Sequence, residues 1–152
     1  MERFEREARD RGLSLEIRQF PDGTRTAEAA ARAVGCEVGQ IVKSLVFVGD
    51  GTPFVALTSG ANRADTARLA EGLGVAEVRR ATPDEARDAT GFAIGGTPPF
   101  GYPRPVPVLM DRDLLGYGVL WAAAGTPQAV FPIGPDDLLR ASAAQPADFK
   151  ET

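Results

Sequence analysis

The chain has 152 residues, of which 43% are hydrophobic and 25% are charged, and this composition excludes a wholly disordered protein. The length predicts one domain over residues 1–152. No run approaches the roughly 18 consecutive apolar residues of a membrane-spanning helix, and the strongly charged start of the chain is unlike a secretory signal. We therefore expect a cytoplasmic protein without a membrane partner.

Histidine is absent from the sequence. Without an imidazole base, a Ser-His-Asp or Cys-His catalytic centre is excluded. The single cysteine, Cys36, can neither form an internal disulfide nor complete a Cys/His zinc site. We expect no metal and no cofactor, so the working groups of an enzyme would be lysine, arginine, carboxylates, hydroxyls or backbone amides.

The net charge of −4 disfavours binding of DNA, or of RNA, through bulk charge alone. Four arginines lie among the first eleven residues, but glutamates alternate with them. Such alternation is typical of a solvated helix face.

The first half of the chain predicts helices interspersed with strands. A polar helix ends before Gly12, and alternating apolar residues follow it as a half-buried strand. Thr26 and Gly35 suit the two ends of a second helix, and the turn 49–53 joins two β-rich runs into a hairpin. In chain order the expected elements are helix 2–10, strand 13–17, helix 27–34, strands 41–48 and 54–58, helix 65–73 and strand 75–79.

The second half begins with a strong helix start, because Thr82 and Glu85 form a capping box around a proline at the first helical position. The glycine- and proline-rich stretch 95–107 excludes a regular helix or a central strand, and from residue 146 we expect a loosely held tail. The expected elements are helix 83–90, strands 106–110, 117–123 and 129–133, and helix 135–141. Consecutive strands in the middle and near the end predict an α+β fold with a mixed sheet.

Lys43 is the first candidate functional residue, because both faces of its strand are mainly apolar. Burial there would disfavour the charged form of the side chain and lower its pKa. The buried ammonium is tolerated if it faces a cleft and contacts an anion or a carbonyl oxygen there. The alternative is a lysine that reaches past a strand end or protects a sheet edge.

The loop Gly95-Gly96-Thr97-Pro98-Pro99-Phe100-Gly101 is the second candidate. Its glycines permit close approach of a ligand to the backbone, its prolines stiffen it, and its amides could bind an oxyanion. A tight connection between elements explains the same residues equally well. Ser59, Asn62 and Asp65 could line a pocket, although they also suit a helix start.

Several segments together resemble the YbaK family, which includes the editing domain inserted in bacterial prolyl-tRNA synthetases. The resemblance rests on the strand Gln40-Ile41-Val42-Lys43-Ser44-Leu45-Val46-Phe47, the loop from Gly95 to Gly101 and the strand end Ala123-Ala124-Gly125, and it covers about residues 25–145. It implies a mixed, mostly antiparallel, partly barrel-like sheet with surrounding helices. It also implies a stand-alone deacylase that acts in trans on mischarged aminoacyl-tRNA, carrying a small amino acid on tRNA-Pro or a related tRNA.

The resemblance also assigns residues. The family's strand lysine falls on Lys43, which is expected to be catalytic. The implied substrate-binding positions are Ser44, Gly95, Gly96, Thr97, Pro98, Gly101, Ala123 and Gly125. The implied partner is the 3′ end of an aminoacyl-tRNA, and a synthetase or an elongation factor could add further contact.

Two departures from the family bear on substrate choice and rate. Pro98 and Ala123 stand where many members carry serine, so two hydroxyls are missing. Two alternatives therefore stay open. One is a non-catalytic member that binds an aminoacyl-tRNA end, a nucleotide or a protein partner, and the other is a sensor of an amino acid or a nucleotide.

Overall fold

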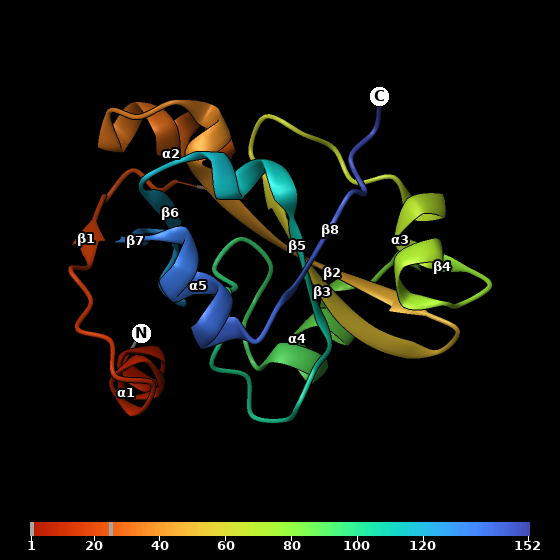
Figure 1. Cartoon of the computed structure of the whole chain (residues 1–152). Helices are drawn as coiled ribbons and strands as arrows, with labels where there is room; N and C mark the ends of the chain where they lie inside the picture. Colours follow the sequence, from red (N-terminus) through yellow and green to blue (C-terminus); the bar gives the residue numbers. More distant parts are fainter. Residues whose placement is uncertain (1, 25) are drawn as a thin grey trace.

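The computed structural model describes residues 2–24 and 26–152, and Figure 1 shows its helices placed around one sheet. The helices are α1 (Glu2–Asp10), α2 (Ala27–Val34), α3 (Thr66–Leu73), α4 (Pro83–Thr90) and α5 (Pro135–Ser142), with 3₁₀ turns η1 (Val38–Gln40) and η2 (Arg112–Gly116). The strands are β1 (Arg18–Gln19), β2 (Ile41–Gly49), β3 (Thr52–Ser59), β4 (Val78–Arg80), β5 (Val108–Asp111), β6 (Leu120–Ala123), β7 (Ala129–Ile133) and β8 (Gln145–Ala147). No helix in the described part of the chain is long and apolar enough to cross a membrane.

The sheet has the order β1-β7-β6-β2-β3-β5-β8, and β4 is added to β2. The pairs β1–β7, β6–β7, β2–β3 and β2–β4 are antiparallel, whereas β2–β6, β3–β5 and β5–β8 are parallel. The expected α+β class and mixed sheet are confirmed. The sheet does not close into a barrel, because β1 and β8 lie at its two ends.

One edge of β2 is divided between two partners. Its first residues, Ile41 and Val42, pair with β6, and residues 47–49 pair with β4. Between these segments the described strands pair with β2 only on the β3 side. β6 and β4 therefore diverge from β2 and leave a gap in the sheet at residues 43–45.

The helix ends follow the predicted capping residues. The Thr26 hydroxyl accepts a hydrogen bond from Ala29 N at 3.0 Å, and Gly35 ends α2 with a φ of 79°. The capping box of α4 forms between Thr82 and Glu85, and the helix ends at Gly91. These contacts satisfy backbone groups that a helix end would otherwise leave without partners.

The N-terminal helix is less solvated than its charges suggest. Phe4 and Ala8 are fully buried, and the Phe4 ring centroid lies 5.0 Å from that of Phe100 and 5.1 Å from that of Phe131. One face of α1 therefore packs against the end of the glycine- and proline-rich loop. The charged residues occupy the remaining surface of the helix.

Two sequence predictions are wrong. The stretch 13–17 is not a strand, because no described strand pairs with it. Leu13, Leu15 and Ile17 instead pack partly buried on the core, and β1 is only the pair of residues that follows.

The expected loose tail after residue 146 is also wrong. Residues 145–147 form β8, which runs parallel to β5, and Phe149 is 1% exposed. In Figure 1 the chain end passes beside the loop that joins β3 to α3. The sequence pattern missed this segment because a three-residue strand that contains proline carries little signal.

Candidate functional site

A cavity of about 240 Å³ lies at the gap along β2. Its walls come from β2, the N-terminal part of α2, the ends of β4 and β6, and the loop after α4. Five of the nine predicted site residues line it, namely Lys43, Ser44, Gly95, Thr97 and Ala123. Gly96, Pro98, Gly101 and Gly125 do not line it.

Lys43 is half-buried, and its Nζ donates a hydrogen bond to the backbone carbonyl of Asn62 at 2.6 Å. Burial lowers the pKa of Lys43, and the negative charge of Glu28 is the largest opposing influence. An ammonium has three N–H donors, so the bond to Asn62 leaves two for other acceptors. The acceptor is a neutral carbonyl, which leaves the positive charge available to an anion or an ester carbonyl.

Ser44 Oγ is the one buried side-chain nitrogen or oxygen atom in the described part of the chain that has no hydrogen-bond partner. A buried hydroxyl of this kind carries a desolvation cost that a bound ligand would offset. The backbone of Ser44 is also oriented toward the gap. Ile41 O bonds toward β3, Val46 O bonds to Ala81 on the opposite edge, and alternate residues of a strand share one direction.

The loop after α4 is held by contacts on its inner side. Thr97 Oγ1 donates to Ala93 O at 3.1 Å, and the hydroxyl of Tyr102 donates to Pro98 O at 2.7 Å. Burial raises the pKa of Tyr102, so its phenol stays protonated and able to donate. These two bonds hold the loop from inside the protein without any ligand.

Of the predicted glycines, Gly95 lines the cavity, whereas Gly96 and Gly101 allow close packing of the loop. A Cβ on Gly96 would meet Thr126 Cα at 2.9 Å and the carbonyl of Gly125 at 3.0 Å, so Gly96 lets this loop lie against the loop after β6. Gly101 has a φ of 90°, and a Cβ there would meet Glu7 Cβ at 3.1 Å. Both positions need glycine for close packing, which was the alternative explanation of this loop.

The cavity also contains residues that the sequence did not indicate as site residues. These are Thr24, Thr26, Arg80, Ile94 and Trp121, among others. Trp121 belongs to the buried core, and its pairing with Ile41 across β2 and β6 also places it at the cavity wall. Parallel pairing between distant segments carries no local signal, so pattern alone could not find these residues.

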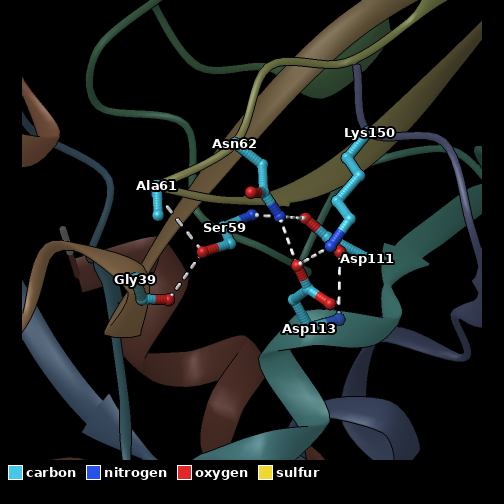
Figure 2. Close-up of polar contacts among 7 residues, drawn as sticks. All are labelled: Gly39, Ser59, Ala61, Asn62, Asp111, Asp113 and Lys150. Carbon is cyan, nitrogen blue, oxygen red and sulfur yellow. Dashed lines mark hydrogen bonds and ion pairs between the residues drawn. The ribbon is translucent and has the colours of Figure 1, made fainter. Parts of the chain in front are cut away.

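A polar network lies beside the site, around a buried carboxylate (Figure 2). Asp111 is 1% exposed and accepts hydrogen bonds from Ser59 N at 3.1 Å, Asn62 Nδ2 at 2.9 Å and Asp113 N at 3.0 Å. The bond from Asp113 N makes Asp111 the cap at the start of η2. Asp65, in contrast, has the helix-start role, because its carboxylate caps α3.

The second carboxylate of this network is paired with a lysine. Asp113 accepts from Asn62 Nδ2 at 2.8 Å and forms an ion pair with Lys150 at 2.8 Å. The hydrogen bond from Lys150 is the main cause that lowers the pKa of Asp113, and the same bond raises the pKa of Lys150. Among residues 2–24 and 26–152, no group of three or more Asp, Glu or Cys side chains is arranged to hold a metal ion.

Comparison with known proteins identifies the family. The model of the aminoacyl-tRNA editing domain matches residues 21–141, and the chain belongs to this family, as its sequence pattern indicated. It is 49% identical to the solved structure of "a putative trans-editing enzyme for prolyl tRNA synthetase", with a TM-score of 0.93 over 99% of this chain and 96% of that one.

Two relatives extend the comparison. The chain is 29% identical over 125 residues to "Putative Cys-tRNA(Pro)/Cys-tRNA(Cys) deacylase EbsC" of Enterococcus faecalis. That match covers 82% of this chain and 76% of the relative. The chain is 36% identical over 94 residues to a proline–tRNA ligase of Citrifermentans bemidjiense. That match covers 62% of this chain but 16% of the ligase, so it concerns one part of a much larger protein.

Proposed function

We propose that this chain hydrolyses the ester bond between an amino acid and the 3′ end of a tRNA, and that the cavity beside β2 binds the aminoacyl group. The observation that carries the proposal is that Lys43 and Ser44, whose hydroxyl is buried without a partner, both line one cavity in a member of the editing family. The names of its relatives, a trans-editing enzyme and a deacylase, support the same reaction.

The reaction needs only modest help from the protein, because an aminoacyl ester is already activated. The oxygen of a water molecule attacks the ester carbonyl, and its proton passes to a base. The C–O bond to the ribose then breaks, and the ribose oxygen takes up a proton. With no histidine in the chain, a neighbouring ribose hydroxyl of the substrate is the proposed relay for these protons.

The protein groups would stabilise the charge that develops on the ester oxygen. The Lys43 ammonium has two free donors for the ester carbonyl or for the terminal phosphate. Amides of the loop at Gly95 and Thr97 would add hydrogen bonds, and such oxyanion donors contribute about 3–4 kcal/mol each in other hydrolases. The Ser44 hydroxyl would bind a polar atom of the aminoacyl group.

The size of the cavity supports a small amino acid as the substrate. Pockets for drug-sized ligands measure about 300–1,000 Å³, whereas this one measures about 240 Å³. We propose a small amino acid wrongly attached to tRNA-Pro or a related tRNA, with the cytoplasm as the place of action. Because the net charge of −4 gives little general attraction to tRNA, a synthetase or an elongation factor would supply further contact.

A deacylation panel tests the proposal. The purified chain is mixed with tRNA-Pro charged with Ala, Cys, Ser or Pro, and with tRNA-Ala and tRNA-Ser charged with their own amino acids. We expect loss of one mischarged ester, which Lys43→Ala should slow to a small residual rate. Arg140→Ala is the matched control, because it also removes one positive charge, from an exposed side chain of α5. Saturable tRNA binding without ester loss would contradict the enzyme and favour the non-catalytic alternative.

A further inference from the structure

We propose that Asn62 is a positioning residue that holds the Lys43 ammonium at the cavity. The inference rests on the proposed function, in which Lys43 contacts the substrate. Asn62 itself does not line the cavity. Its backbone carbonyl accepts from Lys43 Nζ at 2.6 Å, while its side-chain amide donates to Asp111 and Asp113. One residue therefore connects the lysine to two fixed carboxylates.

The first anchor of Asn62 is the buried Asp111. This carboxylate also accepts from the backbone N–H groups of Ser59 and Asp113, so it is tied to the end of β3 and to the start of η2 (Figure 2). A carboxylate that receives several N–H donors makes strong, directional hydrogen bonds. The position of the Asn62 amide is thereby fixed relative to the sheet that carries Lys43.

The second anchor is the C-terminal segment. Lys150 holds Asp113, the other acceptor of the Asn62 amide. The backbone of the same segment also holds the loop that joins β3 to α3 and contains Asn62. Asp65 N donates to Phe149 O and Glu151 N donates to Arg63 O, each at 2.7 Å. This segment lies beyond residue 141, where the match to the family model ends.

These contacts matter because a lysine side chain is long and flexible. Without a fixed acceptor, Nζ could occupy many positions near the cavity. The Asn62 carbonyl selects one of them and takes one of the three donors, so the remaining two are presented in a defined direction. Loss of the Asn62 side-chain amide would remove the direct bonds from the residue that carries this carbonyl to Asp111 and Asp113, so the carbonyl would be held less firmly, although no contact to the substrate would be lost.

The kinetic test compares Asn62→Ala in the wild-type and Lys43→Ala backgrounds. We expect kcat to fall about tenfold or more, because a misplacement of about 1 Å can cost about a hundredfold in rate, while KM stays nearly unchanged. In the Lys43→Ala background the change should have no further effect on residual deacylation, because Asn62 acts through Lys43. An equal loss in both backgrounds would overturn the proposal.

A spectroscopic test needs no activity. The chain has two lysines, Lys43 and Lys150, so protein labelled with ¹⁵N-lysine gives two Nζ signals, assigned with Lys150→Arg. We expect Asn62→Ala to move the Lys43 signal to the position of a free lysine. Asp50→Asn is the matched control, since the Asp50 carboxylate fixes another loop through Ala76 N and Glu77 N. An unchanged Lys43 signal in Asn62→Ala would overturn the proposal.

The two tests separate the possible failures. If the wild-type chain hydrolyses no ester, the proposed function fails, and the lysine signals still decide whether Asn62 positions Lys43. If Asn62→Ala does not fold, Asp113→Ala replaces it, because that position is partly exposed and leaves the bond from Asn62 to Asp111. We then expect a smaller fall in kcat and a smaller signal shift in the same directions, and no change in either would count against the proposal.

Discussion

Lys43 and Ser44 are neighbours in β2, yet both line the same cavity. Successive side chains of a strand point to opposite faces of a sheet, so a cavity on one face would receive only one of them. Both reach it because the cavity lies at the edge of β2, where β6 and β4 diverge. The gap in the sheet thus brings Lys43, Ser44 and strand backbone to one place.

The first prediction concerns the hydroxyl of Ser44. Since Oγ is buried without a partner, Ser44→Ala should leave the Tm unchanged or raise it. If the hydroxyl binds the substrate, kcat/KM should fall about fivefold, which corresponds to about 1 kcal/mol for one hydrogen bond. Thermal unfolding and the deacylation assay measure the two effects.

Ser142→Ala is the matched control for Ser44→Ala, because it makes the same change at a buried hydroxyl that bonds to Leu138 O at 2.6 Å. Here the Tm should fall and the activity should stay the same. A lower Tm for Ser44→Ala with unchanged activity would show that Ser44 has a structural role instead.

Local signals explain what could be predicted from the sequence. The capping box at Thr82 and the hairpin turn before Pro53 depend on neighbouring residues, and the elements they predict are confirmed. The strand that holds Lys43 was found because its apolar pattern is long.

Contacts between distant segments explain the rest. Asn62 and Lys150 are 88 positions apart, and both bond to Asp113. No periodicity in the sequence brings them together, so the network beside Lys43 and the docked C-terminal strand could not be predicted. The roles of Gly96 and Gly101 in packing likewise depend on segments far away along the chain.

A second prediction concerns the size of the amino acid. Ala123 lines the cavity at the end of β6, so Ala123→Val would fill part of about 240 Å³. Deacylation of the bulkier esters in the panel should fall more than that of the alanine ester, since one methylene group can change discrimination by about 10- to 200-fold. Ala33→Val, on the exposed side of α2, is the control. Equal losses for all esters would argue against a role of Ala123 in selection.

The third prediction concerns the support of the loop from Gly95 to Gly101. Tyr102→Phe removes the donor to the buried Pro98 carbonyl and should cost about 1 kcal/mol in stability, or about 2–4 °C in Tm. KM should rise, because the loop is no longer fixed in its binding shape. The other tyrosine, Tyr117, has no hydrogen bond from its hydroxyl within the described residues, so Tyr117→Phe should change neither quantity. An unaltered KM in Tyr102→Phe would show that the support of the loop by Tyr102 does not affect substrate binding.

The fourth prediction concerns the pH dependence of α4, the helix that leads into this loop. The hydrogen bonds from Arg79 lower the pKa of Glu85 to about 2 from its ordinary value of 4.5. A carboxyl with a lowered folded-state pKa stabilises the fold above pH 4.5, and this contribution is lost as the pH falls through about 2. Glu85→Gln should therefore have a lower Tm than the wild type at pH 7.

The deficit of Glu85→Gln should disappear as the pH falls from 4.5 to about 2. Glutamine can still accept from Thr82 N in the capping box, so the comparison isolates the charge. Because the pair with Arg79 is exposed, added salt should also reduce the deficit. A difference in Tm that is constant across this pH range would contradict the charge effect.

The last prediction concerns the cost of keeping Lys43 at the cavity. Burial lowers its folded-state pKa below 10.5, so the folded chain binds protons less readily at this site than the unfolded chain does. The buried ammonium therefore destabilises the fold at pH 7, and the penalty fades as the pH rises through the lowered pKa toward 10.5 and above. Lys43→Met should raise the Tm at pH 7 and strongly slow deacylation, and its advantage in Tm should shrink as the pH rises toward 10.5 and be lost above it. A lower Tm for Lys43→Met at pH 7 would contradict this prediction, because it would show that Lys43 stabilises the fold.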